Sequence, residues 1–234
     1  MKASQHHLDT IRARARSGFE TRKTLNEEIA QIGEYQLDND AQAMRELKAA
    51  AEAELQKLAN AEKTWKKPTV NDRIDAAFEA IRDEGIIVLP NAGYTMSDGW
   101  TEVNGVRSDL QEDGIESRGA IFYHGEDLEA AVRGEPLLLA FGAYATPKAR
   151  NAANIEIART AVEILERYGV GVEWDGSERS RIVIHSFPWQ QRMKTRAPKI
   201  VPLPARAKPV AKTAAAKKTT AKKKTAAKKP VTKK

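Results

Sequence analysis

The charge of this 234-residue chain is divided so unevenly that only part of the chain can form a packed core. Sixteen basic and no acidic residues lie in 191–234, which leaves 23 basic against 32 acidic residues in 1–190. The first part therefore carries a net charge of −9 and the second part +16. Residues 191–234 have few large apolar side chains to offset the entropy cost of ordering, so we expect a disordered tail.

The composition of this tail predicts a phosphate polymer as its partner. From Lys208 onward all charged residues are lysines, whose ammonium groups neutralise phosphates but recognise base edges poorly. No aromatic residue follows Trp189, so the tail cannot stack on unpaired bases. We expect sequence-independent binding to the backbone of DNA or RNA. The expected contact residues are Lys208, Lys212, Lys217, Lys218, Lys222, Lys223, Lys224, Lys228, Lys229, Lys233 and Lys234.

Other roles for the tail are a solubilising extension, or a segment that folds back on the acidic body. A membrane partner is disfavoured because the tail has neither an apolar face nor a cysteine to acylate. Its composition resembles the Lys-Ala-Pro tails of linker histones and of some bacterial histone-like nucleoid proteins. That resemblance implies association with the nucleoid.

The absence of cysteine excludes disulfides, thiolate zinc sites and cysteine nucleophiles. The first residues lack the apolar stretch of a secretion signal, and no apolar run is long enough to cross a bilayer. We therefore expect a cytoplasmic protein. The sequence also lacks the common zinc-protease, phosphate-loop and nucleophile-elbow motifs. It predicts no metal and no cofactor, and it favours a non-enzymatic protein.

Residues 1–66 are predicted to be helical. Apolar stripes run from Leu8 to Ala15, from Leu25 to Ile32 and from Met44 to Leu58, and Thr24 with Glu27 forms the pattern of a capping box. These three helices must either pack on one another or cover the next domain. One hypothesis for the whole chain is an interaction protein that oligomerises through them.

Residues 67–190 are predicted to form a sheet domain. Helical patterns run from Thr69 to Gly85, over 127–133 and from Pro147 to Gly169. The predicted strands are 86–89, 119–124, 137–141, 171–174 and 181–184, the last two as a hairpin. The element order is helix, strand, helix, strand, helix, strand, helix, strand, strand, with the second helix between strands 86–89 and 119–124. It predicts an α/β or α+β layer with a mixed sheet.

Several of these segments resemble a bacterial family catalogued as domain of unknown function 6891. The segments are Ala76–Ile87, Asn91–Gly99, Phe122–His124, Leu138–Gly142 and Gly171–Gly176, and the likeness covers about residues 10–187. It implies fold kinship and a bacterial cytoplasmic setting, with no established activity. Many members carry a Cys-Cys-x-x-Cys-Gly loop where this chain has Tyr94–Gly99. The thiols that could support a metal or redox role there are missing from this chain.

The same loop is the predicted ligand site of the body. It follows a buried strand at its carboxyl end, where open α/β sheets tend to bind ligands. The candidate residues are Asn91, Tyr94, Thr95, Ser97, Asp98 and the strand-end His124. Asn, Ser and Asp also form turns and helix caps, and Asp127 can cap the helix after His124 rather than form a proton-shuttling pair with it. A small-molecule-binding domain or enzyme is thus the alternative to a nucleic-acid-associated protein.

Overall fold

The computed structural model describes residues 2–193, and its amino-terminal part is a bundle of three helices. The helices are α1 (Gln5–Arg16), α2 (Arg22–Gln36) and α3 (Ala41–Ala61), followed by the short 3₁₀ helix η1 (Glu62–Thr64). Their apolar stripes face one another, with Ile11, Leu25 and Leu47 among the fully buried side chains. The stripes read from the sequence are therefore buried inside the bundle.

The start of α2 differs from the sequence-based prediction. Thr21, not Thr24, is the N-cap, and Thr24 takes the third helical position, where it completes the capping box. The Thr21 hydroxyl accepts from the Thr24 amide at 3.1 Å, and the Thr24 hydroxyl accepts from the Thr21 amide at 2.8 Å. A threonine can serve in either place because its hydroxyl both accepts and donates.

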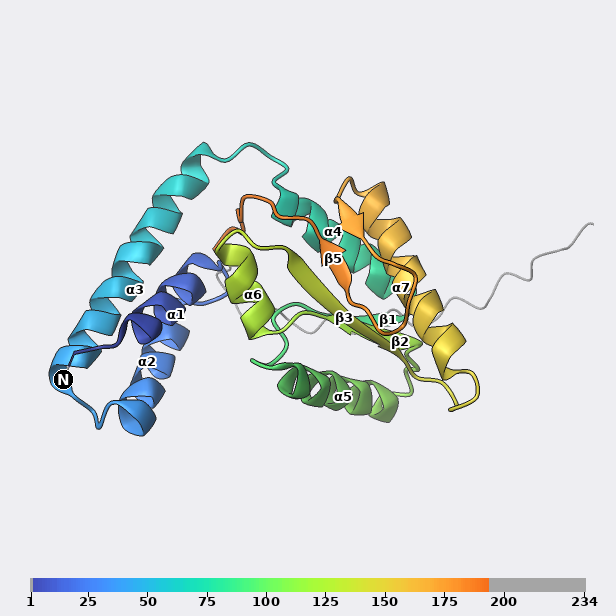
Figure 1. Ribbon diagram of the computed structural model, residues 1–234, viewed down its shortest axis with the longest axis horizontal. Coiled ribbons are helices and arrows are strands. Elements are labelled where there is room, and N and C mark those ends of the chain that lie inside the picture. Colours follow the sequence, from blue (N-terminus) through green and yellow to red (C-terminus); the bar gives the residue numbers. More distant parts are fainter. Residues whose placement is uncertain (1, 194–234) are drawn as a thin grey trace, which may run out of the picture.

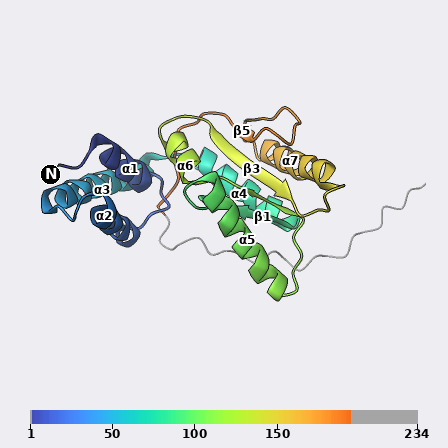
Figure 2. The same cartoon turned by 60° about the horizontal axis from the view of Figure 1, so that its bottom comes forward.

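The remaining residues form a mixed sheet of five strands beside the bundle (Figures 1 and 2). The strands are β1 (Ile86–Leu89), β2 (Gly119–Phe122), β3 (Leu137–Ala143), β4 (Val172–Glu173) and β5 (Ile182–Ile184), in the order β1-β2-β3-β5-β4. Only β1 and β2 are parallel, and the other neighbours are antiparallel. The predicted mixed sheet and the α+β class are confirmed, as is the final hairpin.

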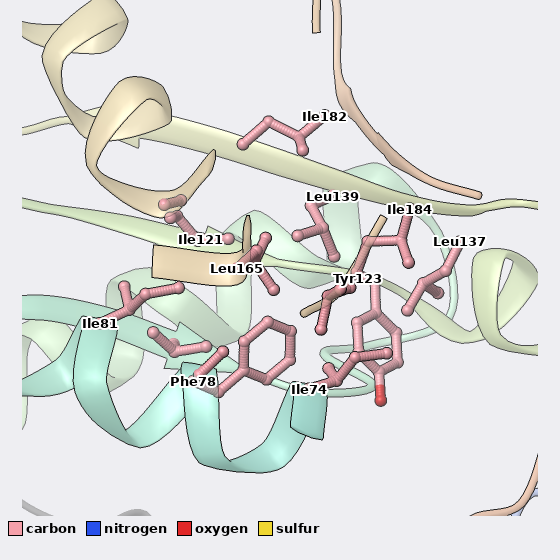
Figure 3. Packing of buried hydrophobic residues seen from close by; sticks show 14 of the residues in the cluster. Ile74, Phe78, Ile81, Ile121, Tyr123, Leu137, Leu139, Leu165, Ile182 and Ile184 are labelled. Atoms are coloured by element: carbon pink, nitrogen blue, oxygen red, sulfur yellow. The ribbon is translucent and has the colours of Figure 1, made fainter. Parts of the chain in front are cut away.

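Helices cover both faces of this sheet. The helices are α4 (Val70–Asp83), α5 (Met96–Glu112), α6 (Gly125–Val132) and α7 (Arg150–Arg167). The larger core lies between the sheet and α4, α6 and α7, and is centred on Phe78, Leu139 and Leu165 (Figure 3). The smaller core lies under α5, where Val103 and Val106 pack against Phe122. Successive β2 side chains point to opposite faces of the sheet, so they pack alternately into the two cores.

Three helix starts in this part of the chain depart from the sequence-based prediction, and one of them is that of α6, which begins at Gly125 and not at Asp127. Residues 96–99, read as part of a loop, are the first turn of α5, which begins after the N-cap Thr95. Helix α7 begins at Arg150, not at Pro147, because residues 146–149 first form a turn closed by the Ala149 amide on the Thr146 carbonyl at 2.9 Å. The predicted limits of α4 are confirmed, with Thr69 as N-cap and Gly85 in the left-handed region after it.

After β5 the chain returns to the bundle and fastens it to the sheet domain (Figure 1). The Trp189 indole donates to the Ser17 carbonyl at 2.9 Å, and the Gln190 amide donates to the Asn71 side chain at 2.7 Å. Gln191 is buried, and Met193 packs against the bundle core. Residues 191–193 fall in the range predicted as tail, and the rest of that tail lies outside the described residues.

Within residues 2–193, no helix combines the length and the apolar character needed to cross a bilayer.

Candidate functional site

The loop after β1 is held against the start of α6. The Ala92 amide donates to the Tyr123 carbonyl at 2.9 Å, and the Gly125 amide donates to the Gly93 carbonyl at 3.0 Å. Asn91 and Gly93 both have positive φ, which turns the chain sharply between strand and helix. A Cβ at residue 125 would approach the Tyr94 ring to 2.7 Å, so glycine there permits the close contact. The predicted loop residue Tyr94 thus lies next to the chain segment that carries His124.

Three other predicted site residues belong to the first turn of α5. The Thr95 amide and hydroxyl both donate to the Asp98 carboxylate, at 3.0 and 2.9 Å. These bonds lower the pKa of Asp98, and the bond from the Thr95 backbone has the larger effect. Ser97 is exposed between them. Thr95 and Asp98 therefore act as the helix cap.

His124 lies at the centre of a buried charged group. Its Nε2 is 3.1 Å from the Asp127 carboxylate, and its backbone amide donates to the same carboxylate at 3.4 Å. Arg181, at the start of the last hairpin strand, donates to both Asp127 oxygens at 2.9 Å. The predicted strand-end histidine lies after the end of β2 and is itself the N-cap of α6, while Asp127 takes the third helical position and accepts from the His124 amide. Its carboxylate also joins α6 to β5, because Arg181 reaches it from across the sheet.

A second charged group, absent from the sequence-based candidates, joins the bundle to the sheet domain. Arg14 on α1 places its Nε 2.9 Å from Glu28 on α2 and 3.6 Å from Glu129 on α6. Its guanidinium also lies over the Tyr94 ring, 5.3 Å from the centroid. The Glu28 and Glu129 side chains are only 18% and 9% exposed, so two largely buried carboxylates flank Arg14. Glu129 also pairs through its other oxygen with Arg133, at 3.7 Å.

A pocket of about 320 Å³ opens beside Arg14 at this junction. Tyr94 is the one predicted site residue that lines it. The other lining residues are His6, Arg14, Glu28, Gln31, Ile32, Tyr35 and Gln36. Carboxylate, amide and phenol groups converge there, which makes the pocket suitable for a small polar ligand. Within residues 2–193, no group of three or more histidine, aspartate or glutamate side chains is placed to hold a metal ion.

Burial controls the protonation of this junction. Burial raises the pKa of Glu28 to about 7 against the opposing charge of Arg14, and Glu20 and Glu129 raise it further. Burial also raises the pKa of Glu129 above its ordinary range, again against Arg14. Both carboxyls bind protons more readily in the folded protein than in the unfolded chain. Stability should therefore decline as pH rises from about 4.5 to about 7, and then level off.

We expect Glu28→Gln to flatten that decline. The neutral amide keeps the shape of the side chain and has no proton to lose, so it should recover about 1–3 kcal/mol of the stability lost between pH 5 and 7. Urea unfolding at several pH values measures the effect. Glu27→Gln, at an exposed neighbouring position on α2, is the matched control. An unchanged pH slope in Glu28→Gln would show that Glu28 is already ionised in the folded protein.

Comparison with known proteins identifies the family. The model of the family described as a domain of unknown function (DUF6891) matches residues 2–193 and leaves out 194–234. No curated protein matches the chain. No solved structure matches it either. The match spans the bundle, the sheet and the junction between them, and on that basis the chain belongs to the DUF6891 family.

Proposed function

We propose that this protein associates with nucleic acid, without sequence specificity, through the eleven lysines between Lys208 and Lys234. The observation that carries the proposal is the separation of charge, with +16 after residue 190 and −9 before it. Lysines spaced along a chain with few apolar side chains can follow a phosphate backbone and release its counterions. The described chain ends at Met193, which packs against the bundle core. If duplex DNA is the partner, the protein should associate with the nucleoid.

Two variants of the full chain test this proposal together. The first changes the eleven lysines of 208–234 to glutamine. The second keeps all eleven lysines but shuffles the order of the amino acids within 208–234. Because backbone contacts depend on charge and not on order, the glutamine variant should lose duplex binding and the permuted one should keep it. Electrophoretic mobility shift with DNA and with RNA duplexes gives both results. Loss of binding on permutation would mean that the lysines are recognised in a particular arrangement.

A second candidate function is the binding of a small organic cation at the junction pocket. Glu28 lines the pocket beside Arg14, and Tyr35 and Tyr94 offer aromatic faces to a cation. An alkylammonium group would pair with the Glu28 carboxylate and lie against these rings. In that case amines should raise the melting temperature of the wild-type chain and not that of the Glu28→Gln variant.

A further inference from the structure

A second pocket, of about 350 Å³, lies where α1 and α3 meet the returning segment 188–190. Two indoles line it, Trp65 from the link after η1 and Trp189 from the segment after β5. We propose that this pocket stacks an unpaired base of a nucleic acid strand. The inference rests on the proposed function and extends it, because it gives the folded body a part in binding.

The aromatic walls of the pocket are already fixed in place. The Trp189 indole donates to the Ser17 carbonyl at 2.9 Å, and its ring stacks on Phe187 with centroids 5.7 Å apart and planes inclined by 27°. The Arg192 guanidinium, which does not line the pocket, lies 5.7 Å from the centre of the Trp65 ring. Both indoles remain partly exposed. A base could stack there at little cost in side-chain ordering.

Two cationic side chains, Arg16 and Lys57, line the same pocket. Glu54 is 4% exposed, and its two carboxylate oxygens accept from Arg16 Nε at 3.0 Å and from Lys57 Nζ at 2.8 Å. Burial acts to raise the pKa of Glu54, but the Lys57 hydrogen bond and the Arg16 charge outweigh it and lower the pKa below its usual range. The carboxylate thus stays ionised and holds both cations. Their side chains are 48% and 70% exposed, which leaves donors free to meet phosphate.

The combination favours a base with its phosphate over a purely apolar ligand. Leu58, Ala61 and Pro188 add apolar surface beside the indoles, while the two cations exceed the one carboxylate by a single positive charge. Base stacking on aromatic side chains tolerates any sequence, in keeping with an unspecific binder. The lysine-rich segment has no aromatic residue of its own, so a preference for single strands would have to come from the folded body.

Fluorescence anisotropy with the full chain tests the pocket. The probes are a labelled single strand of about ten thymidylates and a duplex of the same length, which suit the site sizes of single-strand binders. We expect Trp65→Ala to weaken single-strand binding about 5- to 150-fold, the range found for loss of one stacked base, and to leave duplex binding unchanged. Lys57→Gln should weaken single-strand binding and lower its salt dependence by about one charge, and it should leave duplex binding unchanged.

Two further variants keep the test decisive. Trp65→Phe retains an aromatic face and should restore most of the single-strand affinity, even if Trp65→Ala loses stability. Tyr168→Ala removes an exposed aromatic side chain at the end of α7, away from the pocket, and should change nothing. Single-strand affinity unaffected by Trp65→Ala would overturn the inference. Loss of duplex binding in the lysine-to-glutamine chain, with Trp65-dependent single-strand binding retained, would support both proposals. A wild-type chain that binds only the single strand would uphold the pocket and reject the lysine segment.

Discussion

The affinity of the full chain for a duplex of about 20 base pairs should fall about 10³- to 10⁵-fold between 50 and 200 mM salt. That range applies if about 6 to 10 lysines contact phosphates at once, since each contact releases condensed counterions whose entropy gain shrinks as salt rises. The chain offers eleven lysines from Lys208 onward. We expect the acidic body to compete for the same lysines and so to reduce the apparent affinity at low salt. A salt titration monitored by fluorescence anisotropy measures the slope of log affinity against log salt concentration.

DNA and RNA duplexes should give similar slopes, because lysine contacts the phosphates of both. A slope close to zero would mean that binding, if observed, does not depend on phosphate neutralisation. A strong difference between duplexes of unrelated sequence would contradict backbone recognition, since the lysine side chain reads base edges poorly.

Asp127→Ala should destabilise the folded body by about 3 kcal/mol. The Asp127 side chain is 6% exposed, and its removal leaves Arg181 and His124 without their shared carboxylate while α6 loses its cap. Breaking a buried pair costs about 3–5 kcal/mol, and the lower end applies because Arg181 is 32% exposed. The melting temperature should fall by about 6–12 °C for a body of this size.

Glu126→Ala is the matched control for this substitution. Glu126 is the neighbouring acidic residue on the same helix, and its side chain is 56% exposed. Its loss should change stability by less than about 0.5 kcal/mol. If Asp127→Ala had the same melting temperature as the Glu126→Ala control, the Asp127–Arg181 pair would make no net contribution to stability. Asp127→Asn should fall between the two because the amide oxygen can still accept the hydrogen bond that caps the helix.

The elements that the sequence predicted well are those with a strong local pattern. Helix α4 carries a capping residue, Thr69, and a terminal Gly85, and strand β1 is a run of four apolar residues. Helix α5 lacks such a strong local pattern, because Gly99 and Gly105 interrupt it and its first turn is polar. The Thr-x-x-Asp pattern of Thr95 and Asp98 was the signal that could have located its start.

The junction site could not be predicted because its members are far apart in the chain. Arg14 and Glu129 come from different domains, and nothing in the local pattern around either residue indicates the other. Each resembles an ordinary charged residue on a helix surface. The same holds for Trp65 and Trp189, which only the return of the chain after β5 brings to one pocket. Long-range packing, not local periodicity, creates both sites.

The most direct measurement is the affinity of residues 1–193 for the duplex, compared with that of the full chain. Cutting after Met193 retains every contact by which the returning segment holds the bundle to the sheet. At about 50 mM salt we expect the shortened chain to bind the duplex at least about 100-fold more weakly, because its lysine-rich segment is gone. Equal affinity of the two proteins would contradict it and place duplex binding in the folded body.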